Sequence, residues 1–135
     1  MNREVRRLTD PLPPNYLGAL RRWARTWMDQ RPGSADPDSV VLAMTEMVTN
    51  SVRHGTRPID VELSVGARLV LLQVSDCSDD MPRQPRSGES AIGGRGITLI
   101  DALTCQWGVQ YRPIGKTVWC EFPACGGHLG AAPVP

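Results

Sequence analysis

The chain has 135 residues, of which 41% are hydrophobic and 21% charged, and its formal net charge is +1. This length suits a single domain that buries roughly two-thirds of its unfolded surface, and the hydrophobic share argues against wholesale disorder. The near-neutral charge gives no argument for direct binding to nucleic acid. No apolar run approaches the roughly 20 residues that cross a bilayer, and no secretory signal is evident. We therefore expect a cytoplasmic protein without a membrane partner.

A Pro-rich entry segment, residues 1–14, precedes the predicted domain of residues 15–123, and residues 124–135 are predicted to be a flexible tail. Apolar side chains at helical spacing predict a helix over residues 15–30. Six arginines crowd the first 25 residues: Arg3, Arg6, Arg7, Arg21, Arg22 and Arg25. We interpret them as a solvated helix face, with a docking surface for an acidic partner as the alternative.

The clearest helix lies between Asp36 and Gly55. Asp36 suits the N-cap, Pro37 suits the first helical position, and Gly55 suits the stop. The apolar residues that share one face are Val41, Met44, Val48 and Val52. The polar residues that gather on the opposite side are Glu46, Asn50, Arg53 and His54.

Two strands are predicted next. Residues 59–65 alternate between apolar and polar, as in a strand with one buried face, and residues 69–74 are nearly all apolar, as in a central strand. Asp76 follows directly. The polar stretch from Cys77 to Gly94 is then either a functional loop or a disordered insertion.

The C-terminal part repeats the pattern of helix and hairpin. Gly93-Gly94-Arg95-Gly96 opens an apolar run that fits a helix face, and residues 105–111 and 118–122 alternate as strands. Arg112 to Lys116 is predicted to be the turn between them. Short turns between strands, with helices on one face, predict an α+β sandwich with a mostly antiparallel sheet.

Four cysteines stand at positions 77, 105, 120 and 125. Cys125 and His128 form one C-x-x-H half-site without a second half, so we do not expect a structural zinc site. Cys105 and Cys120 fall in apolar strand patterns, which predicts buried and reduced thiols.

Three motifs carry possible chemistry. Glu46 and Asn50 are neighbours on a helix, where a carboxylate can accept a proton and an amide oxygen can bind Mg²⁺. Asp76, at the end of a buried strand, can accept a hydrogen bond from a ligand amino group. Backbone N–H groups of residues 93–96, at a helix start, favour phosphate. Taken singly, each has an ordinary explanation: a solvated pair, a strand-end cap and a glycine linker.

A fourth motif is set aside. Gly115-Lys116-Thr117 resembles the end of a P-loop, but Gln110 stands where that pattern requires glycine, and a strand follows instead of a helix. We interpret Lys116 as a hairpin-turn residue. Thr117 is expected to face inward, where it can border a ligand.

Taken together and in this order, the motifs resemble those of the Bergerat-fold (GHKL) ATPases, and most closely the bacterial anti-sigma factor serine/threonine kinases. TEMVTNSVRHG resembles the family's N-box, VSDCSDD its adenine-binding box, and GGRGITLIDAL its second glycine box. GKTVWCEF resembles its terminal hairpin. The resemblance spans residues 5–122 and implies a two-layer sandwich with a lid over residues 79–93.

The resemblance also implies ligands and roles. ATP and Mg²⁺ would be bound, with Asn50 as the metal ligand, Glu46 as the catalytic base, and Asp76 on the adenine amino group. The other residues expected to line the nucleotide are Arg53, Gly93, Gly94, Arg95, Gly96, Ile97 and Thr117. The implied partners are a sigma factor and an anti-sigma antagonist protein that is phosphorylated on serine or threonine, and a homodimer is common in the family.

One departure keeps alternatives open. The adenine box of the family reads D-x-G-x-G, whereas Ser78 and Asp80 stand at the two glycine positions after Asp76. A non-catalytic ATP-binding module that sequesters a regulator is therefore the second hypothesis, and a domain that no longer binds nucleotide is the third. Because no histidine-bearing dimerisation helix precedes the domain, a complete sensor histidine kinase is not expected.

Overall fold

The structure is a computed structural model that describes residues 2–78 and 106–124. Its elements are β1 (Arg3–Leu8), α1 (Tyr16–Asp29), α2 (Pro37–His54), β2 (Ile59–Val65), β3 (Leu69–Asp76), β4 (Gln106–Tyr111) and β5 (Lys116–Pro123). The predicted glycine loop and helix after residue 93, together with Cys105 and the tail, lie outside the described residues. No helix within the described ranges has the length and apolar character needed to span a membrane.

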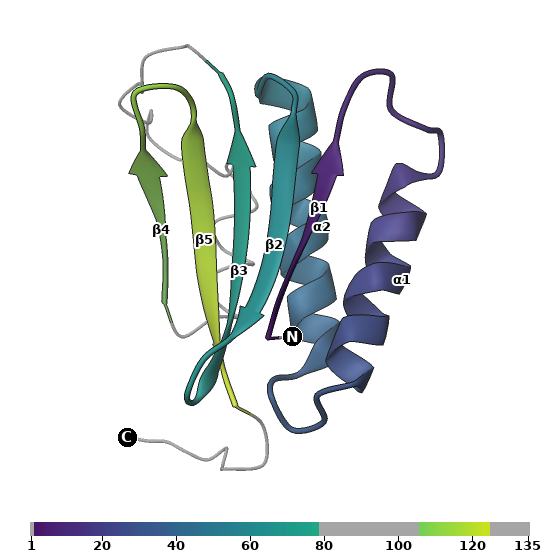
Figure 1. The fold of residues 1–135 in the computed structure, drawn as a ribbon, viewed down its shortest axis with the longest axis vertical. Helices are drawn as coiled ribbons and strands as arrows, with labels where there is room; N and C mark the ends of the chain where they lie inside the picture. The colour runs from purple at the N-terminus through teal and green to yellow at the C-terminus, as the bar shows by residue number, and fades with distance from the viewer. Residues whose placement is uncertain (1, 79–105, 125–135) are drawn as a thin grey trace.

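The five strands form one sheet in the order β1-β2-β3-β5-β4, and every neighbouring pair is antiparallel. Both helices lie on the same side of this sheet, with α2 against β2 and β3 and with α1 against α2 (Figure 1). The predicted α+β sandwich with a mostly antiparallel sheet is therefore confirmed.

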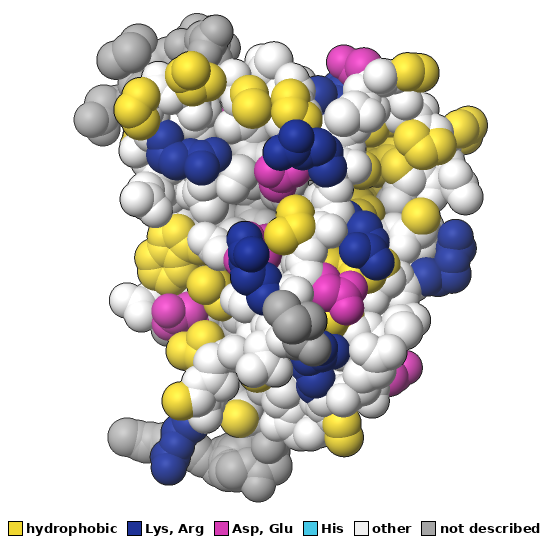
Figure 2. Space-filling model, viewed as in Figure 1, with side chains coloured by type: hydrophobic (Ala, Val, Ile, Leu, Met, Phe, Trp, Pro, Cys, Tyr) yellow, Lys and Arg dark blue, Asp and Glu magenta, His cyan; other side chains and the backbone are white. Residues whose placement is uncertain are grey.

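Strand β1 corrects the interpretation that the six N-terminal arginines form one helix face. The guanidinium of Arg3 donates to both carboxylate oxygens of Glu62, at 2.7 and 3.2 Å, and Arg7 donates to both oxygens of Asp60, at 2.7 and 3.0 Å. Figure 2 shows basic side chains lying beside acidic ones on the face of the sheet that it displays. Arg3, Arg6 and Arg7 therefore belong to a charged edge strand, and only the later arginines lie on a helix.

Helix α2 begins and ends as its sequence predicts. The carboxylate of Asp36 accepts hydrogen bonds from the backbone N–H of Ser39, at 3.3 Å, and from its hydroxyl, at 2.7 Å. These bonds satisfy a backbone donor that a helix start leaves without a partner. At the other end, the N–H of Gly55 donates to the carbonyl of Ser51 at 2.7 Å. The helix is thereby fixed at both ends.

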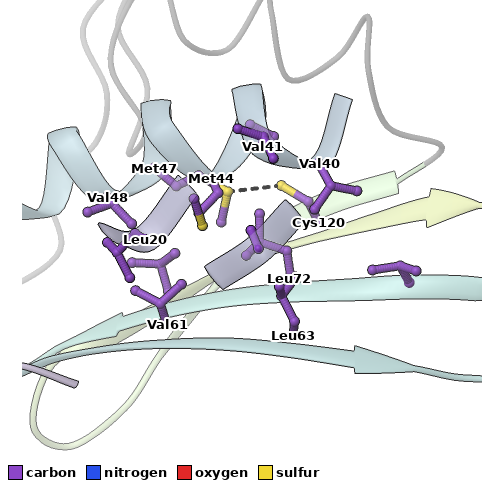
Figure 3. Close-up of a cluster of buried hydrophobic side chains, with 14 of the residues drawn as sticks. Leu20, Val40, Val41, Met44, Met47, Val48, Val61, Leu63, Leu72 and Cys120 are labelled. Carbon is purple, nitrogen blue, oxygen red and sulfur yellow. Dashed lines mark hydrogen bonds between the residues drawn. The ribbon is translucent and has the colours of Figure 1, made fainter. Parts of the chain in front are cut away.

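The core lies between α2 and the sheet (Figure 3). Val41, Met44 and Val48 are buried as predicted, and Met47 joins them. The Cys120 thiol donates to the sulfur of Met47 at 3.3 Å, and burial raises the pKa of this thiol to about 12. Cys120 is therefore a buried and protonated thiol, as the strand pattern predicts.

Candidate functional site

Asp76 is the most deeply buried acidic residue among those described, with an exposed fraction of 1%. Its Oδ2 accepts a hydrogen bond from Lys116 Nζ at 2.7 Å, and its Oδ1 accepts one from the backbone N–H of Ser78 at 3.0 Å. Removing a carboxylate from water is costly unless an opposite charge and further donors compensate it. Lys116 and Ser78 provide this compensation at the end of β3.

The C-terminal end of α2 closes over this carboxylate. A Cβ placed on Gly55 would lie 2.7 Å from Asp76 Oδ2, so a side chain at this position would collide with the carboxylate. Gly55 has φ −97°, which any residue adopts, and glycine is therefore needed for the close approach rather than for the dihedral angle. The N–H of Cys77 also donates to the carbonyl of Thr56 at 2.9 Å. The ends of α2 and β3 are thus joined directly.

The start of β5 closes the other side. Gly115 has φ +83°, and a Cβ there would lie 1.9 Å from the Asp76 carbonyl oxygen, so both its dihedral angle and its surroundings require glycine. The next residue, Lys116, is paired with Asp76 in the antiparallel register. Lys116 is therefore the first residue of β5 and not the turn residue that the sequence predicted, because the turn ends at Gly115.

The alternation of β5 is the signal by which sequence reasoning could have placed Lys116 in the site. Successive side chains of a strand point to opposite faces. Val118 and Cys120 face the helices, so Lys116, two residues earlier, shares their face. Counting back by two from the core residues of the strand could have placed this lysine beside Asp76.

Thr117 takes the orientation opposite to the predicted one. It is buried, but it pairs with Ser75, and the two hydroxyl oxygens are 2.8 Å apart. Ser75 and Thr117 alternate with Asp76 and Lys116, so they lie on the face of the sheet that points away from α2. The expectation that Thr117 faces inward is therefore wrong, and the structure does not bring it together with the Asp76 carboxylate.

Glu46, Asn50 and Arg53 all lie on α2, as predicted. Glu46 and Asn50 are half-buried on successive turns, whereas Arg53 is exposed in the last turn. Glu46 makes no hydrogen bond or ion pair with the described part of the chain. At 1.5 Å rise per residue, Asn50 lies roughly 7 Å, and Glu46 roughly 13 Å, along the helix axis from the Gly55 contact with Asp76. This spacing suits an elongated ligand that carries a hydrogen-bond donor at one end and anionic groups at the other.

The remaining predicted residues, Gly93, Gly94, Arg95, Gly96 and Ile97, lie outside the described residues. Within residues 2–78 and 106–124, no group of three or more His, Cys, Asp or Glu side chains could hold a metal ion.

Comparison with known proteins places the chain in a family. A model of the histidine kinase-like ATPase domain matches residues 11–122. Among solved structures, the histidine kinase domain of the blue-light activated histidine kinase EL346 from Erythrobacter litoralis matches with a TM-score of 0.55 and 22% sequence identity. This match covers 86% of the chain and 64% of the solved one, so the chain spans less than two-thirds of that domain and shares its fold. No curated protein matches the sequence. Since the family model covers most of the chain, this protein belongs to the family of histidine kinase-like ATPase domains, which are ATP-binding domains of the GHKL type.

Proposed function

We propose that this protein is an ATP-dependent serine/threonine-protein kinase of the anti-sigma type. It sequesters a sigma factor and phosphorylates an anti-sigma antagonist protein on serine or threonine. The proposal assumes the cytoplasm as its compartment, and a homodimer stays a prediction. The family match supports ATP binding, and the anti-sigma branch rests on the motif resemblance.

The observation that carries the proposal is the contact between Asp76 and the end of α2. A Cβ on Gly55 would lie 2.7 Å from Asp76 Oδ2, which fixes the buried carboxylate against the helix that carries Asn50 and Glu46. The end of β3 and helix α2 together therefore offer a hydrogen-bond acceptor for a base, an amide oxygen for a hard cation, and a carboxylate for proton transfer.

These residues fit ATP with Mg²⁺ by the chemistry of their donor atoms. Asp76 would hold the adenine amino group, and Asn50 would hold Mg²⁺, which neutralises phosphate charge when it is bound. Glu46 would accept the proton of the attacking serine or threonine hydroxyl. Phosphoryl transfer depends on positioning and charge neutralisation more than on covalent chemistry by the protein, so a small constellation of this kind suffices.

Thermal unfolding with and without Mg-ATP tests the binding step. A ligand that binds only the folded state stabilises it by about 2.7 kcal/mol at a hundredfold excess over Kd. We expect this shift in the wild type and its loss in Asp76→Asn. Asp38→Asn is the matched control, because Asp38 is exposed and pairs with Arg25 on the surface. The absence of any shift in the wild type would reject the ATP-dependent function.

Phosphotransfer from γ-labelled ATP to a candidate antagonist tests the catalytic step. We expect Glu46→Ala to keep the Mg-ATP thermal shift but to lose labelled serine or threonine, because only the base is removed. Equal labelling by Glu46→Ala and wild type would refute the role of Glu46.

A non-catalytic ATP-binding module is the second candidate. Ser78 stands where the adenine box of the family has its first glycine, and its N–H already caps the Asp76 carboxylate. A chain that forms a tight, ATP-dependent complex with a sigma factor or antagonist, yet transfers no label to it, would favour this candidate over the kinase.

A further inference from the structure

Lys116 is the only lysine of the chain. Its side chain has an exposed fraction of 20%, and Nζ lies 2.7 Å from Asp76 Oδ2. An ammonium group carries three N–H donors. Asp76 takes one of them, and Nζ makes no other hydrogen bond with the described residues.

The pair therefore presents a donor and an acceptor side by side. The carboxylate of Asp76 has about four positions that accept hydrogen bonds, and Lys116 and Ser78 occupy two of these. With respect to residues 2–78 and 106–124, acceptor positions remain on Asp76 and donors remain on Lys116. The two groups can then bind a ligand that itself carries a donor beside an acceptor.

The burial of Asp76 relative to Lys116 indicates which class of ligand the pair can bind. Asp76 has an exposed side-chain fraction of 1% against 20% for Lys116, so the acceptor lies deeper than the donor. The atom of a purine that projects furthest along its six-position edge is the exocyclic substituent, which is flanked by ring nitrogens. An amino group there meets a carboxylate favourably, whereas the carbonyl oxygen of guanine or hypoxanthine would meet it with like polarity.

We propose that Lys116 is a specificity-determining residue that donates a hydrogen bond to a ring nitrogen of the adenine while Asp76 accepts from the amino group. This inference rests on the proposed ATP binding and adds to it a second base contact. Lys116 thus acts as more than the counter-ion of Asp76. It selects 6-aminopurines together with that carboxylate.

Base analogues separate this role from a structural one. We would measure Kd values of wild type, Lys116→Met and Lys116→Arg for ATP, GTP, 1-deaza-ATP and 7-deaza-ATP. A charge-assisted hydrogen bond is worth about tenfold or more in affinity. The wild type should bind ATP at least about tenfold more tightly than it binds GTP. It should also bind ATP at least about tenfold more tightly than the deaza analogue that lacks the contacted ring nitrogen. Lys116→Met should bind ATP and that analogue within about twofold of each other, and Lys116→Arg should restore part of the difference.

Arg68→Met is the matched control, because it removes an exposed charge from the turn between β2 and β3. It should bind all four nucleotides as the wild type does. Equal loss of affinity for ATP and both deaza analogues in Lys116→Met would reduce Lys116 to a counter-ion and overturn the proposal. Tighter ATP binding by Lys116→Met would also overturn it, because the lysine would then block the site.

The single lysine permits a second readout on the wild type alone, should the Met variant fail to fold. Selective ¹³C-lysine labelling gives one set of side-chain resonances, which ATP should shift and GTP at the same concentration should not. A wild type that binds ATP without any shift of this signal contradicts the base contact and leaves the proposed function intact. A wild type that binds no ATP contradicts both.

Discussion

Replacing Gly55 by alanine tests the joint between α2 and Asp76 most directly. The new Cβ would lie 2.7 Å from Asp76 Oδ2, 2.8 Å from Asp76 Cγ and 2.8 Å from the Ser51 carbonyl oxygen. The carbonyl belongs to the helix backbone, and the carboxylate is held by Lys116 and Ser78. No flexible side-chain end can move away, so the helix end or the carboxylate has to shift.

Extra atoms forced into a well-packed site cost about 1–3 kcal/mol of unfolding free energy. For a chain of this size, that corresponds to a fall in Tm of roughly 3–15 °C. Circular dichroism thermal melts, supported by urea titration, measure this change. Because the carboxylate is displaced, we also expect Gly55→Ala to lose most of the Tm rise that Mg-ATP gives the wild type.

Gly18→Ala is the matched control for Gly55→Ala. Gly18 lies within α1, and a Cβ there would meet only Arg22 Nη1 at 3.6 Å, an ordinary contact. Alanine is favoured over glycine in a helix interior by about 0.5–1 kcal/mol, so this variant should match or exceed the wild type in stability. A Gly55→Ala protein that melts at the wild-type temperature and keeps its response to Mg-ATP would refute the close approach of α2 to Asp76.

Three further predictions concern the scaffold of the site. Burial raises the pKa of the Cys120 thiol from its usual 9.0 to about 12. The contribution of this thiol to stability is therefore complete below pH 9 and is lost as pH rises toward 12, by about 1.4 kcal/mol per pH unit. Urea titrations from pH 8 to 10.5 should show a steeper loss of stability for wild type than for Cys120→Ala. The hydrogen bond from Arg7 holds the pKa of Asp60 below its usual 3.8, so the pair stabilises the fold above pH 3.8 and loses its effect as pH falls through the lowered pKa. Arg7→Gln should lower the urea midpoint at pH 6, and the difference in midpoint from wild type should disappear in acid. Asp36→Ala removes the N-cap hydrogen bond to Ser39 and should lower the free energy of unfolding by about 0.5–2 kcal/mol. Urea titration measures this change, and an unchanged midpoint would show that the cap is dispensable.

The sequence predicts those elements whose local signals and core pattern agree. The cap at Asp36, the apolar face of α2 and the alternation of residues 59–65 all survive in the structure. Strand β1 could not be predicted in this way, because its residues are mostly charged and exposed. It is paired with β2 along its whole length, and two bidentate ion pairs between these strands join positions more than 50 residues apart. Such pairing depends on the tertiary fold and leaves no periodic signal in the strand itself.

The site residues likewise include one that the local sequence pattern predicted and one that it did not. Asp76 was predicted from its position after an apolar strand, and its burial agrees with that position. Its neighbour at the start of β5 was predicted wrongly, because the turn pattern left Lys116 outside the strand, so the alternation of Val118 and Cys120 was not extended to it. The turn pattern suggested a start after Lys116, whereas pairing with β3 begins at Lys116.

This register determines what the site can recognise. With β5 starting at Lys116, the lysine and Asp76 lie on the face that packs against α2, at the edge of the apolar core, while Thr117 pairs with Ser75 on the other face. A hydrogen bond to a charged group is stronger where water is excluded. We therefore expect an ion pair at the end of the core to discriminate between ligands more sharply than a threonine hydroxyl that is already paired with Ser75. The ability of this domain to distinguish one base from another should accordingly depend on Asp76 and Lys116, and Thr117→Ala should leave the ratio of ATP to GTP affinity unchanged.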